Sequence, residues 1–188
     1  MRSVAEIIHS HEVLDSTGIH IGGTDKHGPN HWYGDAYELL FASLGGRDSV
    51  KLIMEMGVAD GACLQAWKEV FPNATIVGMD IHPSERAHGD RIEFHLGDQR
   101  SIADCERAAG GRLFDLIIDD ATHLIEDTLR TLFYLWPSVR RGGVYVVEEF
   151  PAVGTIRNII EMWPFAEIVP TAGPSGGIEP LVVFRKPL

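Results

Sequence analysis

The sequence has few cysteines, no long apolar run and fewer positive than negative charges. It has two cysteines in 188 residues, which gives no support to a disulfide scaffold or a cysteine-ligated zinc site. No apolar run reaches the roughly 18 residues that a membrane-spanning helix needs, and the N-terminal segment has no signal-peptide core. The net charge of −11 disfavours a surface that binds nucleic-acid phosphates. We therefore expect a cytoplasmic protein that binds neither membranes nor nucleic acids.

The middle of the chain alternates short apolar runs with helical patterns. The apolar runs begin at residues 52, 75, 92, 114, 144 and 181, and Gly, Asp or Pro bounds each, as is typical of buried parallel strands. Helical patterns cover residues 62–71, 101–109 and 122–136. The alternation predicts an α/β fold with an open, mostly parallel, Rossmann-like sheet, helices on both of its faces and a C-terminal antiparallel strand.

The two ends of the chain differ from the middle. Residues 4–14 predict a helix, 16–32 a loop rich in glycine and histidine, and 37–44 a second helix. Near the C-terminus, a helix is predicted at 156–163 and a hairpin-like strand pair at 167–170 and 181–187. We expect a single domain over residues 1–188, with a helical and loop cap segment at 1–45 and a Rossmann-like core at 46–188.

Acidic residues and glycines close successive strands of the predicted sheet. In open α/β sheets, ligands bind beyond the carboxyl ends of the strands. Like charges gathered in a partly buried cleft raise each other's pKa and repel, so we expect a bound cation or a cationic ligand to compensate them. The strand-end residues, in chain order, are Glu55 and Gly57, Asp80, Gly97 and Asp98, Asp119 and Asp120, and Glu148 and Glu149.

The segment from Glu55 to Gly61 follows a strand and opens a helix. Its two glycines, Gly57 and Gly61, allow a tight turn and a close approach of the backbone to a ligand. A dinucleotide fingerprint needs three glycines, and Asp60 would face a pyrophosphate, so NAD is disfavoured. Asp80 closes the next strand, where an acid commonly accepts hydrogen bonds from the ribose of an adenosine ligand. The alternative is a tight turn followed by an acid near the start of the helix.

Together, the acidic glycine loop, Asp80 and the segment 97–99 resemble the class I S-adenosylmethionine-dependent methyltransferases. The stretches TDKHGPNHWY (24–33), GDQ (97–99), IDDATH (118–123) and GGVYVVEEF (142–150) look like the metal-dependent sugar O-methyltransferases of antibiotic biosynthesis. This resemblance covers roughly residues 22–150. The cofactor-binding residues that we expect are Glu55, Gly57, Gly61, Asp80, Asp98, Gln99, Asp119, Thr24 and Tyr33.

The resemblance also implies a metal site and a general base. Asp120, Glu148 and Glu149 would bind Mg²⁺ or Mn²⁺, and His123 would be the base. The alternatives are a helix-capping role for Asp120 and solvated strand-end charges for the two glutamates. The chain departs from the family at Glu148 and Glu149, where the pair Glu–Asp is expected, because the longer second side chain moves its carboxylate by about one methylene.

The chemistry of methyl transfer explains these residue types. A neutral hydroxyl is a poor nucleophile, and a hard cation can bind two neighbouring hydroxyls and lower their pKa. His123 lies three residues after Asp120, so the two share a face if a helix begins there, and an imidazole titrates near a pH of about 6.5. Asp120 and His123 are therefore the predicted catalytic residues.

We expect an O-methyltransferase that acts on a hydroxyl of a polyhydroxylated, sugar-bearing small molecule in natural-product tailoring. One alternative is a methyltransferase acting on another vicinal diol or a catechol, because either kind of acceptor could chelate the metal. Another is a module that binds the cofactor without turnover. The resemblance and the apolar helix faces also lead us to expect a homo-oligomer.

Overall fold

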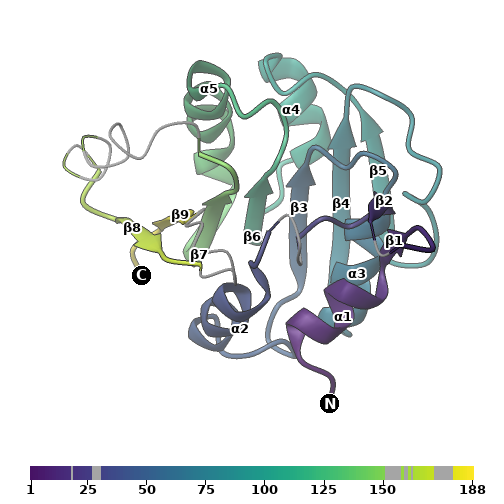
Figure 1. The fold of residues 1–188 in the computed structure, drawn as a ribbon. Coiled ribbons are helices and arrows are strands. Elements are labelled where there is room, and N and C mark those ends of the chain that lie inside the picture. Colours follow the sequence, from purple (N-terminus) through teal and green to yellow (C-terminus); the bar gives the residue numbers. More distant parts are fainter. Residues whose placement is uncertain (18, 27–30, 151–157, 159–160, 162, 172–179) are drawn as a thin grey trace.

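The computed structural model describes residues 1–17, 19–26, 31–150, 158, 161, 163–171 and 180–188. Within them, a seven-stranded sheet forms the centre of the molecule, in the order β5-β4-β3-β6-β7-β9-β8 (Figure 1). The strands are β3 (Leu52–Met56), β4 (Thr75–Asp80), β5 (Ile92–Leu96), β6 (Phe114–Asp119), β7 (Val139–Val147), β8 (Ala166–Val169) and β9 (Leu181–Arg185).

Strand directions agree with the prediction. β3 is parallel to β4 and β6, β4 is parallel to β5, and β6 is parallel to β7. β9 is antiparallel to both β7 and β8, which confirms the C-terminal antiparallel strand and the strand pair. The chain builds outwards from β3 to β5 and then returns to β6 on the other side of β3. This reversal creates a crevice between β3 and β6, where open α/β sheets bind ligands.

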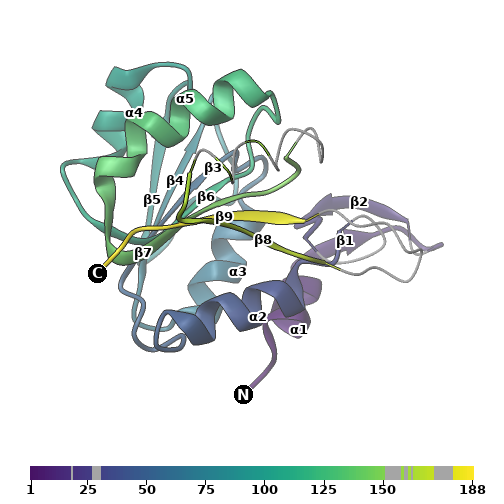
Figure 2. The same cartoon turned by 90° about the vertical axis from the view of Figure 1, so that its left-hand side faces the viewer.

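Helices cover both faces of the sheet (Figure 2). On one face lie α1 (Val4–Ser10), α2 (Gly34–Ser43) and α3 (Ala62–Val70), and on the other lie α4 (Ile102–Ala109) and α5 (Ile125–Leu135), which a short 3₁₀ helix (Trp136–Ser138) follows. Successive strand residues face opposite sides, so Ile53 packs in the core with Trp67 of α3, and Met54 packs with Leu132 of α5. These two cores hold the strand ends in place.

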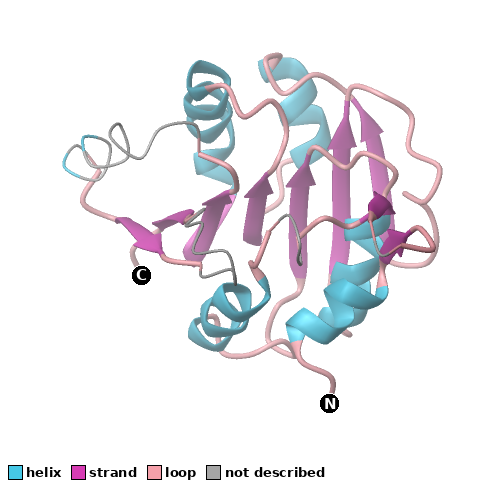
Figure 3. Ribbon diagram, in the orientation of Figure 1, coloured by secondary structure: helices cyan, strands magenta, loops and turns pink. Residues whose placement is uncertain are grey.

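The N-terminal segment differs from the prediction. The helix predicted for residues 4–14 ends at Ser10, and β1 (Glu12–Leu14) pairs with β2 (His20–Gly23) in an antiparallel hairpin (Figure 3). Asp15 closes the turn, because its Oδ1 accepts hydrogen bonds from the backbone N–H of Thr17 at 2.8 Å and of Ile19 at 3.0 Å. This turn lies at the beginning of the loop that the sequence predicted at 16–32. The second helix, α2, is present but begins three residues earlier than expected.

The helix predicted at 156–163 lies for the most part outside the described residues. In the part of the chain that the structure describes, no helix is both long enough and apolar enough to cross a membrane.

Candidate active site

Two glycines shape the loop between β3 and α3. Gly57 and Gly61 have φ angles of 81° and 87°, a left-handed conformation that other residues rarely adopt. A Cβ atom on Gly57 would overlap the backbone carbonyl of Asp120, so this loop passes very close to the end of β6. Asp80 holds the loop from β4, because its Oδ2 accepts a hydrogen bond from the backbone N–H of Val58 at 2.8 Å.

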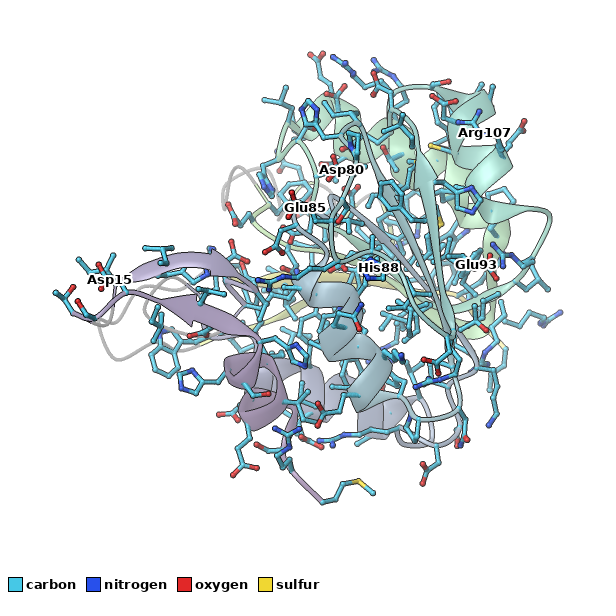
Figure 4. All side chains as sticks on the ribbon, turned by 90° about the vertical axis from the view of Figure 1, so that its right-hand side faces the viewer. Asp15, Asp80, Glu85, His88, Glu93 and Arg107 are labelled. Carbon is cyan, nitrogen blue, oxygen red and sulfur yellow. The ribbon has the colours of Figure 1, made fainter. Side chains whose placement is uncertain are left out.

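A cavity of about 230 Å³ lies beside this loop, at the carboxyl ends of β3, β4, β5 and β6, and we call it the glycine-loop pocket. In Figure 4 the side chain of Asp80 lies toward the upper edge of the sheet, far from Asp15 at the tip of the hairpin. The lining residues are Met56, Gly57, Met79, Asp80, Ile81, His82, Gly97, Asp98, Gln99, Arg100, Ala121 and Thr122.

Four of the predicted cofactor-binding residues line this pocket: Gly57, Asp80, Asp98 and Gln99. Hydrogen bonds from Arg100, whose Nη2 lies 2.7 Å from Oδ2, lower the pKa of Asp98. Gln99 is buried, and its Nε2 donates to Thr131 Oγ1 at 3.0 Å while its Oε1 accepts from the backbone N–H of Thr122 at 3.0 Å. Gln99 therefore ties the end of β5 to α5 and to the segment before it.

A second cavity of about 280 Å³ adjoins the first and shares Gly57, Asp80 and Ala121 with it. We call it the acidic pocket, because five carboxylates contribute to its walls. Its lining residues are Gly23, Asp25, Gly57, Val58, Ala59, Asp60, Cys63, Asp80, Asp120, Ala121, His123 and Glu149. The two pockets meet at the crevice between β3 and β6.

Side chains in and beside the acidic pocket could hold a metal ion. Donor atoms of Asp120, His123 and Glu149 lie within 4.8 Å of one another, and so do donor atoms of Asp25, His31 and Glu149. Carboxylate oxygens are the ligands that Mg²⁺ and Mn²⁺ prefer, and imidazole is compatible with Mn²⁺. The chemistry of this donor set therefore fits a hard divalent cation.

Backbone strain coincides with two of these donors. His123 and Glu149 have φ angles of 54° and 47°, in a region that costs non-glycine residues about 1–3 kcal/mol and is often found at functional sites. Glu149 Oε1 lies 3.1 Å from His31 Nε2, and its Oε2 lies 4.0 Å from His123 Nε2. The hydrogen bond with His31 lowers the pKa of Glu149.

The structure brings Asp120, His123 and Glu149 together, as the sequence predicted, and adds Asp25 and His31. Both added residues lie in the stretch 24–33, in which the resemblance assigned a role to Thr24 and Tyr33 but not to Asp25 or His31.

Glu148, the third predicted metal ligand, is not part of this donor group. It lies with Glu55 and Asp120 around a wholly buried lysine, Lys26. The Lys26 Nζ atom is 2.6 Å from Asp120 Oδ2, 2.7 Å from Glu148 Oε2 and 3.3 Å from Glu55 Oε1. The Tyr37 hydroxyl donates to Glu148 Oε1, so donors from the chain occupy both carboxylate oxygens of Glu148. We call Lys26 and these three acidic residues the Lys26 cluster.

The charges of the Lys26 cluster depend on one another. Burial raises the pKa of Glu55 to about 7 and that of Glu148 to about 8, although Lys26 opposes both shifts. Burial alone would lower the pKa of Lys26, but the nearby Asp120 and Glu148 outweigh it and raise that pKa well above its ordinary value. The neighbouring acids therefore favour the charged form of Lys26 inside the protein.

Five other predicted cofactor-binding residues line neither pocket: Glu55, Gly61, Asp119, Thr24 and Tyr33. Glu55 accepts a hydrogen bond from Trp67 Nε1 at 3.1 Å. Asp119 accepts one from the Tyr145 hydroxyl at 2.7 Å, and burial raises the pKa of Asp119 to about 7. Both carboxylates lie within the sheet layers because their residues belong to the strands themselves rather than to the loops beyond them.

The remaining three residues, Thr24, Tyr33 and Gly61, lie beside the site and shape the segments that border it. Thr24 and Tyr33 are wholly buried on either side of the 27–30 segment, and the Tyr33 ring stacks on His31 with ring centroids 5.1 Å apart. Gly61 shapes the glycine loop, because a Cβ atom there would overlap the backbone of Ala87.

The fold matches that of methyltransferases of known structure. The MycE methyltransferase from the mycinamycin biosynthetic pathway, in complex with Mg, SAH and mycinamycin VI, aligns with a TM-score of 0.75 at 22% identity. The alignment covers 99% of this chain and 54% of that chain. The chain therefore has the Rossmann-like class I methyltransferase fold that its sequence predicted.

Sequence comparison gives the closer relationship, although no protein-family model matches the chain. It is 34% identical over 137 residues to 8-demethyl-8-(2-methoxy-alpha-L-rhamnosyl)-tetracenomycin-C 3'-O-methyltransferase of Streptomyces olivaceus. It is 33% identical over 135 residues to demethylmacrocin O-methyltransferase of Streptomyces fradiae. These similarities confirm the predicted resemblance to the sugar O-methyltransferases of antibiotic pathways. Each covers 67% of this chain, and the chain spans about a third of the length of these relatives.

Proposed function

We propose that the protein is an S-adenosylmethionine- and divalent-metal-dependent O-methyltransferase that acts on a hydroxyl of a sugar-bearing small molecule. The observation that carries this proposal is that the glycine-loop pocket and the acidic pocket adjoin at Gly57, Asp80 and Ala121. A cofactor that fills the first pocket would direct its reactive end towards the metal donors and the histidine of the second.

The glycine-loop pocket suits the adenosine part of the cofactor. Asp80 and Asp98 supply carboxylates at the ends of neighbouring strands, and Gly57 lets the ligand approach the backbone. The presence of SAH in the MycE complex supports this assignment. When bound, S-adenosylmethionine supplies a methyl group on a sulfonium, and neutral S-adenosylhomocysteine would be the leaving group.

The acidic pocket suits the acceptor hydroxyl. When bound, a hard cation would lower the pKa of two neighbouring hydroxyls and orient one of them, and the MycE complex with Mg supports this role. Asp120 and Glu149 would hold the cation, with Asp25 and His31 as further donors. His123 would accept the hydroxyl proton at Nε2, and the nearby Glu149 carboxylate would stabilise the imidazolium that forms.

The names of the relatives support a sugar acceptor, since one is a methyltransferase of a rhamnosyl tetracenomycin. Two alternatives remain testable: another vicinal diol or catechol acceptor, and a module that binds the cofactor without turnover. The net charge of −11 favours a small molecule over a nucleic acid.

Calorimetry on metal-stripped protein tests the cofactor and the metal. S-adenosylmethionine and S-adenosylhomocysteine should bind and NADH should not, and Mg²⁺ should bind with the sulfur cofactor present. Failure of both sulfur cofactors to bind, with and without Mg²⁺, would refute the proposal. Methylation assays with a rhamnoside and a catechol then separate the acceptor classes, because the sugar hypothesis predicts Mg²⁺-dependent turnover of the rhamnoside alone.

A further inference from the structure

Lys26 connects the N-terminal segment to the ends of three strands. Its ammonium lies within 3.3 Å of carboxylates from β3, from the residue after β6 and from the residue after β7: Glu55, Asp120 and Glu148. The side chain of Lys26 is 0% exposed, so its cost of burial must be balanced by these partners. Part of the positive charge that the acidic strand ends require therefore comes from the chain itself.

Asp120 belongs both to this cluster and to the donor group of the acidic pocket. Its Oδ2 atom lies 2.6 Å from Lys26 Nζ, and no other described donor hydrogen-bonds to its side chain. The carboxylate is 15% exposed, it lines the acidic pocket, and it offers a donor atom within 4.8 Å of those of His123 and Glu149. Lys26 thus holds Oδ2 of Asp120 from the protein interior, and Oδ1 remains available to a ligand.

We propose that Lys26 is a positioning residue of the metal site. Its ammonium fixes Asp120 through Oδ2, and this orients Oδ1 for a divalent cation in the acidic pocket. The inference rests on the proposed function, because it concerns the cation of that same site. Glu148, together with Glu55, keeps the ammonium in place.

Two effects of Lys26 on a cation oppose each other. Its charge repels a second cation, so a purely Coulombic role predicts tighter metal binding once the charge is removed. Its hydrogen bond orients a ligand, so a positioning role predicts weaker binding, since loss of such a partner typically costs about 10–100-fold in metal affinity. Glu55 and Glu148 also contact the ammonium and hold it in place beside Asp120, and we therefore expect positioning to dominate.

Titration calorimetry of Mg²⁺ into protein saturated with S-adenosylhomocysteine tests this inference. Lys26→Met should weaken Mg²⁺ binding by about 10-fold or more. Lys26→Arg, which retains the charge, should recover part of that loss. Lys68→Met is the matched control, because Lys68 pairs with the exposed Asp90 outside the site, and it should leave Mg²⁺ affinity unchanged. The stoichiometry of S-adenosylhomocysteine binding in the glycine-loop pocket measures the fraction of folded molecules in each sample.

Unchanged or tighter Mg²⁺ binding by folded Lys26→Met would overturn the inference while leaving the proposed function intact. If Lys26→Met does not fold, Lys26→Met/Glu55→Gln removes one charge of each sign and is compared with Glu55→Gln alone. The same 10-fold difference is expected between those two variants, and equal affinities would overturn the inference. Wild-type protein that binds neither S-adenosylhomocysteine nor Mg²⁺ would instead overturn the proposed function, and this inference with it.

Discussion

The glycine-loop pocket and the acidic pocket share one edge of the sheet but are built in different ways. Among the residues that line the first, the left-handed backbone position is a glycine, Gly57, and a carboxylate and an amide are held by backbone N–H groups. Around the second, the left-handed positions include three residues other than glycine, Ala59, His123 and Glu149, and three acidic side chains nearby surround a buried ammonium. The first pocket is shaped by backbone geometry and the second by charge. We expect this difference if the first pocket binds a cofactor and the second carries out proton transfer.

Substitution of Gly57 tests whether backbone geometry shapes the first pocket. Gly57→Ala adds left-handed strain of about 1–2 kcal/mol and an overlap with the Asp120 carbonyl, so we expect a loss of about 3 kcal/mol of stability. Binding of S-adenosylhomocysteine should fall with it. Gly46→Ala is the matched control, because Gly46 has a φ angle of 87° but no atom within 4 Å of an added Cβ. Denaturant unfolding that gives equal losses for the two variants would contradict the close approach of loop and strand.

Substitution of His123 tests the chemistry of the second pocket. His123→Ala should lower turnover by about 10²-fold or more, because the acceptor hydroxyl loses its base, while S-adenosylhomocysteine affinity stays within about twofold. His88→Ala, at an exposed histidine outside both pockets, should have no effect on either quantity. A parallel loss of turnover and cofactor affinity in His123→Ala would mean that cofactor binding and proton transfer do not belong to separate pockets.

Substitution of Asp80 tests whether the first pocket binds the cofactor independently of the metal site. Asp80→Asn replaces one carboxylate oxygen with an NH₂ group and removes the charge, which weakens the hydrogen bonds to the glycine loop and to a ribose hydroxyl, so S-adenosylhomocysteine affinity should fall about tenfold. Calorimetry should show no change in Mg²⁺ affinity, although Asp80 also borders the acidic pocket. Asp90→Asn, at a carboxylate that pairs with Lys68, provides the control. A larger effect on Mg²⁺ than on the cofactor would place Asp80 among the metal donors.

The sequence predicted the sheet and the positions of its strand ends, because apolar runs bounded by glycine and acidic residues are local signals. It did not separate the roles of neighbouring acids such as Glu148 and Glu149. These two residues lie one position apart, yet one faces Lys26 and the other His31. Which side each takes depends on the partner that packs there, and Lys26 comes from more than 100 residues away in the chain.

The hairpin β1–β2 was missed for a related reason. Its closing turn depends on the side chain of Asp15, and a helical pattern over residues 4–14 obscured the change at His11. Asp25 and His31 could have been found, since both lie in the family-like stretch 24–33, but their spacing carries no local pattern and only the fold brings them to Glu149.

The smallest expected effect concerns Asp119, which lies behind both pockets. Burial raises its pKa from 3.8 to about 7. Between these values the folded protein keeps a proton that the unfolded chain has lost, so this residue lowers stability as the pH rises from about 4 to 7. The slope for one proton is at most about 1.4 kcal/mol per pH unit. Glu55, with a pKa raised to about 7, acts in the same direction.

Asp119→Asn removes one of these two protons and should keep an acceptor for the Tyr145 hydroxyl. We therefore expect the free energy of unfolding of the variant to fall less steeply with pH than that of the wild type. Urea unfolding between pH 4.5 and 7.5, with a chelator present to exclude metal, measures the difference. Parallel curves would show that Asp119 is ionised in the folded protein throughout. Asp119 would then resemble Glu149 of the acidic pocket, whose hydrogen bond with His31 lowers its pKa.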